Sequence, residues 1–477
     1  MQTTEESMTP IERRASIGLA GIYGLRMLGM FIILPIFAIY AQHLPGGESH
    51  TLIGLALGAY GLTQAILQIP AGWLSDRYGR KPVIYAGLVL FAIGSFVAAS
   101  SDTIYGVIFG RVIQGAGAIN AAVMALTADL TREEHRTKAM ALIGMTIGVT
   151  FSISLVLSPL LYQLIGVPGI FAMTGVLSIA AFGVVAWVIP DPKITRFHSE
   201  TEASTKKFGE VLRNKDLLRL DFGIFVQHAI LMSVFMQVPF VLRRDGLAAV
   251  EHWKVYLPVM LIAFALMVPP IIYAEKKAKI KLVFLAAVAL AAASQVALLL
   301  WQDSIWGVAL SLLLFFTAFN VLEATLPSMI SKIAPLSAKG TAMGVYSSVQ
   351  FFGAFFGATA GGFILQHYGG NAVFIFAIAL LLLWLLVSFG MKAPAAVRTK
   401  LYHLPDMSEA QGALLQQKLA QLPGVREAMV AGTEGMACLK IEAQGFDEAA
   451  VEQLVRNPHP NPPPEGEGAM VRNVKSF

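Results

Sequence analysis

Four ionisable side chains lie inside stretches of the chain that are otherwise apolar. Glu323 and His228 are two of them, and a carboxylic acid or an imidazole can bind and release a proton there. Arg26 and Arg111 are the other two. A charged group inside a membrane costs about 3 kcal/mol or more unless it is paired or hydrated, so each is a candidate for proton coupling or substrate binding. Two alternatives stay open. His228 could be an interior histidine whose hydrogen bonds are made within the protein, and Arg111 could serve helix packing by binding backbone carbonyl groups.

A short charged loop, residues 72–81, has the sequence Gly-Trp-Leu-Ser-Asp-Arg-Tyr-Gly-Arg-Lys. Its glycine at position 72 allows a close approach to a neighbouring helix. Asp76 can accept backbone N–H groups from the N-terminus of another helix, and Arg80 can bridge Asp76 to a second acid, Asp129. We therefore predict a charged latch made of Gly72, Asp76, Arg77, Gly79, Arg80 and Asp129. A solvated turn without such a role is the alternative.

Two further segments combine polar and small residues. Gln114 follows Arg111 in the sequence Arg-Val-Ile-Gln-Gly-Ala-Gly, and we assign both to the same candidate site. Small residues let helices pack closely in membranes. Gly148, Ser154, Ser158 and Pro159 are predicted to serve this purpose.

The elements that position these residues are membrane-spanning helices. The chain is 56% hydrophobic and 14% charged, with a mean hydropathy of +0.65, whereas a soluble protein carries roughly a quarter charged residues. A helix needs about 20 mainly apolar residues to cross the hydrocarbon. Twelve segments qualify: residues 16–41, 51–74, 82–100, 104–127, 139–164, 168–190, 218–241, 254–273, 281–301, 305–328, 339–366 and 371–391.

Lysine and arginine are concentrated in alternate connections between these segments. They occur in connections 2–3, 4–5, 8–9 and 10–11 and in the long segment 191–217, and only Arg243 and Arg244 break the pattern. Positively charged connections stay in the cytoplasm, so both termini are predicted to be cytoplasmic. The net charge of +5 reflects these connections and is weak support for nucleic-acid binding.

After the last span the composition becomes that of a soluble domain. Residues 400–404, 425–430 and 437–442 are predicted strands, and residues 408–422 and 447–455 are predicted helices, the first capped by Ser408. The predicted organisation is an N-terminal six-helix half (1–190), a cytoplasmic linker (191–217), a C-terminal six-helix half (218–392), a small cytosolic α+β domain (398–455) and a disordered tail (456–477).

Nothing in the sequence supports an enzyme or a bound cofactor. The phosphate-binding pattern Gly-x4-Gly-Lys-Ser/Thr is absent, and no nucleophile constellation stands out. Cys438 is the only cysteine, so neither a disulfide within the chain nor a cysteine-based metal cluster can form.

The loop at residues 72–81 and the motif around Arg111 resemble those of major facilitator superfamily transporters. The segment around Ser158 and Pro159 partly resembles the antiporter motif of that superfamily, with Ser158 in place of a glycine. The order β-α-β-β-α of the small domain resembles a ferredoxin-like domain without its last strand. It is also distantly similar to heavy-metal-associated domains, but their Cys-x-x-Cys is absent, so no metal is expected. The whole chain resembles bacterial drug–proton antiporters that carry such an appended domain.

This resemblance implies twelve helices in two six-helix halves, located in the bacterial inner membrane. It implies that Asp76 meets the N-terminus of the eleventh helix, near residues 337–340, and that Arg111 takes part in proton coupling. The expected function is proton-coupled efflux of a small solute or drug by a monomer surrounded by lipid. Two alternatives remain open: a proton-coupled symporter of a polar or anionic metabolite, and a transport-inactive sensor.

Overall fold

The computed structural model describes residues 8–191, 205–393, 397–405, 407–432, 435–442 and 445–456. The chain divides into two compact units. The larger, membrane unit comprises Met1–Ala334 and Ala338–Pro394, and the smaller unit comprises Pro335–Ser337 and Ala395–Phe477. Residues 457–477 of the predicted disordered tail lie outside the described residues, as do residues 192–204 of the predicted linker, whereas Arg456 ends α16.

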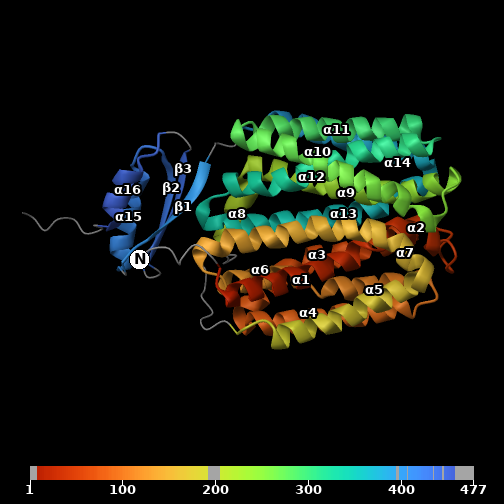
Figure 1. Ribbon diagram of the computed structural model, residues 1–477, viewed down its shortest axis with the longest axis horizontal. Coiled ribbons are helices and arrows are strands. Elements are labelled where there is room, and N and C mark those ends of the chain that lie inside the picture. The colour runs from red at the N-terminus through yellow and green to blue at the C-terminus, as the bar shows by residue number, and fades with distance from the viewer. Residues whose placement is uncertain are drawn as a thin grey trace, which may run out of the picture. The chain divides into compact units, whose positions relative to one another are not determined.

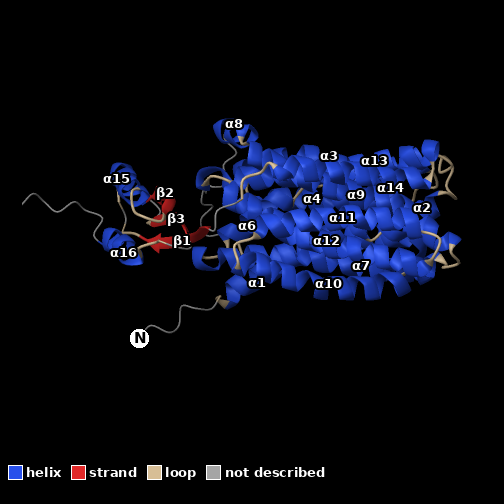
Figure 2. Cartoon of the chain, turned by 90° about the horizontal axis from the view of Figure 1, so that it is seen from above, coloured by secondary structure: helices blue, strands red, loops and turns tan. Residues whose placement is uncertain are grey.

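The membrane unit consists of helices that lie side by side in both views (Figures 1 and 2). Its first half contains α1 (Pro10–Phe31), α2 (Leu34–Ala41), α3 (His50–Tyr78), α4 (Arg80–Ala99), α5 (Ile104–Ala116), α6 (Asn120–Asp129) and α7 (Glu133–Trp187). Its second half contains α9 (Lys215–Arg244), α10 (Trp253–Lys276), α11 (Ile280–Trp301), α12 (Ile305–Ile333), α13 (Lys339–Tyr368) and α14 (Gly370–Phe389). The short helix α8 (Thr205–Arg213) precedes α9, and the 3-10 turns η1 (Ala249–Glu251) and η2 (Leu336–Ala338) precede α10 and α13.

Among the described residues, eleven helical stretches are long and apolar enough to cross a membrane. One of them, Lys138–Trp187, is 50 residues long and contains Gly166, whose φ of 66° interrupts the helix. Glycine adopts this left-handed conformation without a steric penalty. Dividing the stretch there gives twelve spans, as the sequence predicts.

Two of the predicted spans are broken helices, which the hydropathy pattern does not reveal. The first is divided between α1 and α2 just before Pro35, which lacks a backbone N–H. The fourth is divided between α5 and α6 at Gly117, where a Cβ would lie 2.3 Å from the carbonyl oxygen of Gly87. Several helices also extend beyond their apolar runs, because polar turns continue the helix past the hydrocarbon. The first span, for example, begins at Pro10 behind a capping box formed by Thr9 and Glu12.

The two halves meet where α3 packs against α13, which lie beside each other in Figures 1 and 2. Gly54 and Gly58 face the backbone of α13, and Gly362 of α13 faces the backbone of α3. All three glycines lie in the portions of the helices that are remote from Asp76. This end of the contact is therefore closed by direct backbone packing.

The small unit contains a three-stranded antiparallel sheet in the order β1-β3-β2. Its elements are β1 (Val397–His403), α15 (Glu409–Ala420), β2 (Val425–Ala431), β3 (Met436–Glu442) and α16 (Glu448–Arg456). Ser408 and Gln411 form a capping box at the start of α15. Strand β1 starts three residues before the predicted strand, because Val397 already pairs with Glu442. Among the described residues β1 has a single strand neighbour, so one of its edges is unpaired.

A valine at position 54 should disrupt the contact between the halves. A Cβ at Gly54 would lie 2.2 Å from the carbonyl oxygen of Ala358, and such overpacking costs about 1–3 kcal/mol. We expect Gly54→Val to lower the melting temperature of the purified protein. Gly144→Val is the matched control, since a Cβ at Gly144 meets no atom within 4 Å. Equal melting temperatures for the two variants would contradict the close packing of α3 on α13.

Candidate functional site

A charged cluster joins the ends of α3, α4 and α6. Arg80, 4% exposed, pairs with Asp76 and donates from Nε to Oδ2 of Asp129 at 3.2 Å. Its Nη1 also donates to Oγ of Ser75 at 3.0 Å. The structure thus brings the three predicted residues Asp76, Arg80 and Asp129 into contact. We call the end of the membrane unit that carries this cluster the basic end.

The remaining residues of the loop shape the turn between α3 and α4. Gly79 has a φ of 96°, in the left-handed region that favours glycine. Gly72 lies close to α6, since a Cβ there would be 3.2 Å from the Cβ of Ala121. Arg77 points outwards, and its guanidinium lies 5.5 Å from the ring centroid of Trp73.

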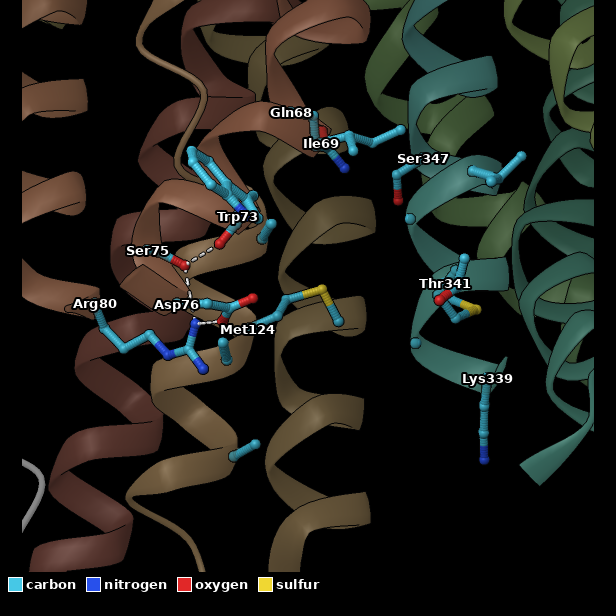
Figure 3. A pocket seen from close by; sticks show the side chains of 18 of the residues that line it. Gln68, Ile69, Trp73, Ser75, Asp76, Arg80, Met124, Lys339, Thr341 and Ser347 are labelled. Carbon is cyan, nitrogen blue, oxygen red and sulfur yellow. Dashed lines mark hydrogen bonds and ion pairs between the residues drawn. The ribbon is translucent and has the colours of Figure 1, made fainter. Parts of the chain in front are cut away.

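At the basic end the two halves are separated by a cavity of about 290 Å³. In Figure 3, Asp76 and Trp73 of α3 lie on one wall, and Lys339 and Thr341 at the start of α13 lie on the other. The side chain of Asp76 is 26% exposed. The predicted meeting of Asp76 with the N-terminus of the eleventh helix is therefore absent in this conformation.

At the opposite end side chains join the two halves: Arg243 of α9 donates to Oε1 of Gln42 at 3.3 Å, and Gln366 of α13 makes the larger set of hydrogen bonds. The Oε1 atom of Gln366 on α13 accepts hydrogen bonds from Oγ of Ser49 at 2.9 Å, from N of Thr51 at 3.0 Å and from Oγ1 of Thr51 at 2.7 Å. This contact continues the glycine-mediated packing of α3 on α13. The membrane unit is thus closed at the opposite end and open at the basic end.

Arg26 of α1 is fully buried and is held by uncharged groups. It donates to the carbonyl oxygen of Gly117, at the break between α5 and α6. Its Nη2 donates to Oε1 of Gln64 at 2.7 Å and to the hydroxyl of Tyr60 at 3.2 Å. The helix break supplies the acceptor, because the carbonyls of a terminating helix have no partner in their own helix.

Arg111 of α5 is also fully buried and has no carboxylate partner among the described residues. Its guanidinium donates to the carbonyl oxygens of Gly29 at 3.1 Å and Leu57 at 3.3 Å, and to Oε1 of Gln114 at 2.7 Å. It also lies 4.8 Å from the ring centroid of Tyr60. The structure therefore brings Arg111 and Gln114 together, in contact with the same tyrosine that binds Arg26.

In the second half, Glu323 and His228 form a polar cluster. Oε1 of Glu323 lies 3.3 Å from Nε2 of His228 and accepts a hydrogen bond from Nε2 of Gln227 at 3.1 Å. Nε2 of Gln350 on α13 lies 2.9 Å from the same histidine nitrogen. The cluster joins α9, α12 and α13. Tyr23 of α1 interacts electrostatically with both Arg26 and Glu323, so the two polar clusters are neighbours.

The small residues of α7 lie in different environments. Ser154 is buried and donates to the carbonyl oxygen of Thr150 at 2.7 Å, and Ser158 is also buried. Pro159 lies within the helix. A Cβ at Gly148 would meet no atom within 4 Å, so no close packing occurs at this position in this conformation.

Two buried acids escaped the sequence analysis. Asp221 of α9 is 4% exposed, and neither carboxylate oxygen has a hydrogen-bond partner among the described residues. It lies near the start of the predicted span 218–241, where an acid looks like part of the preceding polar segment. Glu12 of α1 is 5% exposed and accepts hydrogen bonds from the backbone N and from Nε of Arg132, at 2.8 and 3.0 Å. A signal for Glu12 was the capping pattern Thr-x-x-Glu.

Within the described residues, no group of three or more histidine, cysteine, aspartate or glutamate side chains could hold a metal ion. The side chains that the structure brings together support charge pairing at Arg80 and proton exchange between Glu323 and His228.

The sequence matches the family model of the Major Facilitator Superfamily over residues 19–358 and, in a second match, over residues 257–415. It is 45% identical over 449 residues to the inner membrane transport protein YajR of Escherichia coli K12, which covers 94% of this chain and 98% of that protein. It is 24% identical over 348 residues to the multidrug resistance protein MdtH of Aeromonas hydrophila, which covers 71% of this chain and 84% of that protein.

Among solved structures, a bacterial homologue of the human lysosomal transporter Spinster, in an inward-facing and occupied conformation, resembles this chain with a TM-score of 0.68. The match covers 80% of this chain and 97% of that chain at 14% sequence identity, which establishes a common fold.

Replacing Arg111 by alanine should destabilise the first half. The substitution leaves buried acceptors without their charged donor, at a cost of about 1–3 kcal/mol, and it also leaves a cavity. We expect the variant to unfold at a lower denaturant concentration than the native protein. Arg77→Ala, which removes an exposed arginine of the same half, is the control and should leave the transition unchanged. A native-like transition for Arg111→Ala would show that its contacts contribute nothing.

Proposed function

The chain belongs to the Major Facilitator Superfamily, and from this premise we propose that it exports a small solute in exchange for protons. It is a multi-pass membrane transporter and its relatives are not enzymes. In the proposal it works in a bacterial inner membrane, with both termini and the basic end in the cytoplasm. The assignment to the inner membrane draws on the relative from Escherichia coli, and the orientation draws on the positively charged connections.

The observation that carries the proposal is the contact between Glu323 and His228. Both lie within spans, and their 3.3 Å separation lets a proton exchange between the carboxyl group and the imidazole. Gln227 and Gln350 hold the two groups with neutral hydrogen bonds, so no permanent cation fixes Glu323 in its ionised form. A residue of this kind can change its protonation state once in each transport cycle.

The two ends of the membrane unit supply the conformational part of the cycle. In the conformation described, Gln366 closes the opposite end, and the cavity beside Asp76 separates the halves at the basic end. We infer that rocking of the halves releases Gln366 and brings the N-terminus of α13 onto Asp76, where a carboxylate is favoured by the helix dipole. Arg80 and Asp129 then hold Asp76 in position. In this proposal the loop acts as a latch.

The direction of transport has support on both sides. The name of the relative MdtH, a multidrug resistance protein, favours efflux. Arg26 and Arg111 favour the second candidate, uptake of an anionic solute together with protons, because neither is neutralised by a carboxylate among the described residues. The sign of pH-dependent flux in proteoliposomes distinguishes the two, and flux by reconstituted protein of any sign excludes a transport-inactive sensor.

The decisive experiment begins with a thermal-shift screen of the purified protein against metabolites and drugs at two pH values, because a bound solute stabilises the folded state. The solute found is then used for flux measurements in proteoliposomes with an imposed pH gradient. We expect Glu323→Gln to abolish gradient-driven flux and to retain exchange of solute for solute. Undiminished proton coupling in this variant would remove Glu323 from the mechanism. Glu251→Gln is the control, since the side chain of Glu251 is 40% exposed and pairs with Lys254, away from Glu323.

Substitutions that weaken the contacts at the opposite end and at the basic end should change the rate of thiol labelling in opposite directions. The reporter is Met343→Cys, in the cavity at the basic end, in a chain that carries Cys438→Ser. Gln366→Leu removes three hydrogen bonds that close the opposite end, so the basic end should close more often and labelling by an impermeant thiol reagent should slow. Asp76→Asn removes the charge that receives α13, so labelling should be faster. Changes of the same sign in both variants would contradict the proposed cycle.

A further inference from the structure

A buried acid that the proposed mechanism leaves unused lies below the Glu323 cluster on α9. Asp221 is 4% exposed, and neither of its carboxylate oxygens has a hydrogen-bond partner among the described residues. Burying an ionised carboxylate without a partner costs several kcal/mol, whereas the neutral acid costs far less. A buried acid without a partner therefore costs little stability only in its protonated form.

Asp221 and His228 lie on the same face of α9. They are seven residues apart, which is two helical turns or roughly 10 Å along the axis. Helix α9 starts at the basic end, so Asp221 lies between that end and the cluster of His228 and Glu323. The acid is therefore positioned on the route that a proton would take from the basic end.

Helix α13, which packs on α9, provides a group at an intermediate position. Tyr346 is 4% exposed and its hydroxyl also has no hydrogen-bond partner among the described residues. This hydroxyl interacts electrostatically with both carboxyl groups, those of Glu323 and Asp221. One turn further along α13, Gln350 contacts His228. The polar groups of α9 and α13 thus face each other at two successive levels.

The charged groups nearest in sequence to Asp221 are engaged elsewhere. Arg219 donates to Oδ1 of Asp216 at 2.9 Å and to the carbonyl oxygen of Gly390 at 3.1 Å. Among the described residues, no cationic side chain forms an ion pair or a hydrogen bond with either oxygen of the Asp221 carboxyl group. Asp221 therefore has no cation that would keep it permanently ionised.

We propose that Asp221 is a second proton-binding residue, which exchanges protons with Glu323 through the hydroxyl group of Tyr346. In the step towards the basic end, the proton leaves the carboxyl oxygen of Glu323 and bonds to the hydroxyl oxygen of Tyr346, while the original hydroxyl proton passes to an oxygen of Asp221. One O–H bond forms for each that breaks, and the tyrosine ends unchanged. A water molecule can bridge the groups, as is usual between buried polar atoms. This role rests on the proposed function, in which Glu323 carries the proton.

Infrared spectroscopy of the purified full-length protein tests the proposal with the proton as the probe. A carbonyl stretching band of a protonated carboxyl group should appear as the pH is lowered and should be missing in Asp221→Asn. Asp216→Asn, whose carboxylate pairs with Arg219 near the exposed start of the same helix, should retain the band. A band that is absent from the native protein, or that persists unchanged across the pH range, overturns the proposal.

The relay is tested by the rate at which Glu323 takes up a proton after a pH jump. Its own infrared band is identified by its loss in Glu323→Gln. We expect Asp221→Asn and Tyr346→Phe to slow the appearance of this band roughly tenfold or more, and Asp221→Glu to restore it. Native melting temperatures establish that the variants are folded. If Glu323 took up its proton at the native rate in both Asp221→Asn and Tyr346→Phe, the proposed proton transfer through Tyr346 would be overturned.

The outcomes for this proposal and for the proposed function are separable. A pH-dependent Asp221 band in a protein whose transport ignores the pH gradient contradicts the proposed function and supports the proton site. Gradient-driven transport without such a band supports the proposed function and overturns the assignment of Asp221.

Discussion

The structure depends on one constraint, which is that a permanently charged group inside the membrane unit must find its partners in the protein. Arg26 and Arg111 meet this constraint without carboxylates, by donating to backbone carbonyls and to glutamine side chains. The acceptor for Arg26 exists only because the fourth span is broken at Gly117. The break in the helix and the buried cation therefore explain each other, since either alone would leave an unsatisfied group in a medium without water.

The residues along α3 and α13 explain why this pair of helices closes the protein at one end and leaves it open at the other. Along α3 and α13 the contact near Gly54 is made by backbone against backbone, which requires the absence of side chains. Towards Asp76 the helices instead carry long or charged side chains that line a cavity. Close packing is insensitive to protonation, whereas in the proposed cycle the charged end responds to the field of a helix terminus. The two ends thus differ in what can open them.

The sequence was sufficient for the number of spans, the family and the contact of Arg80 with Asp76 and Asp129, because hydropathy and residue spacing are local properties. It could not identify the partners of Arg26, because a carbonyl freed by a helix break leaves no trace in hydropathy. It did not distinguish Asp221 from the polar residues before its span, since the depth of a residue in a helix depends on how far the helix extends past the hydrocarbon. Span boundaries were short for the same reason.

The two halves hold their ionisable groups in different ways, and this difference gives the proposed coupling a physical basis. The guanidinium groups of the first half are held by backbone acceptors and remain charged throughout. The Glu323 cluster of the second half is held by side chains that can rearrange. Tyr23 of the first half interacts with both Arg26 and Glu323, so the fixed positive charge lies near the acid when the opposite end is closed. When the halves rock, that charge moves relative to Glu323 and the proton affinity of the acid must change with it. By reciprocity, the binding of a proton must then shift the balance between the two conformations.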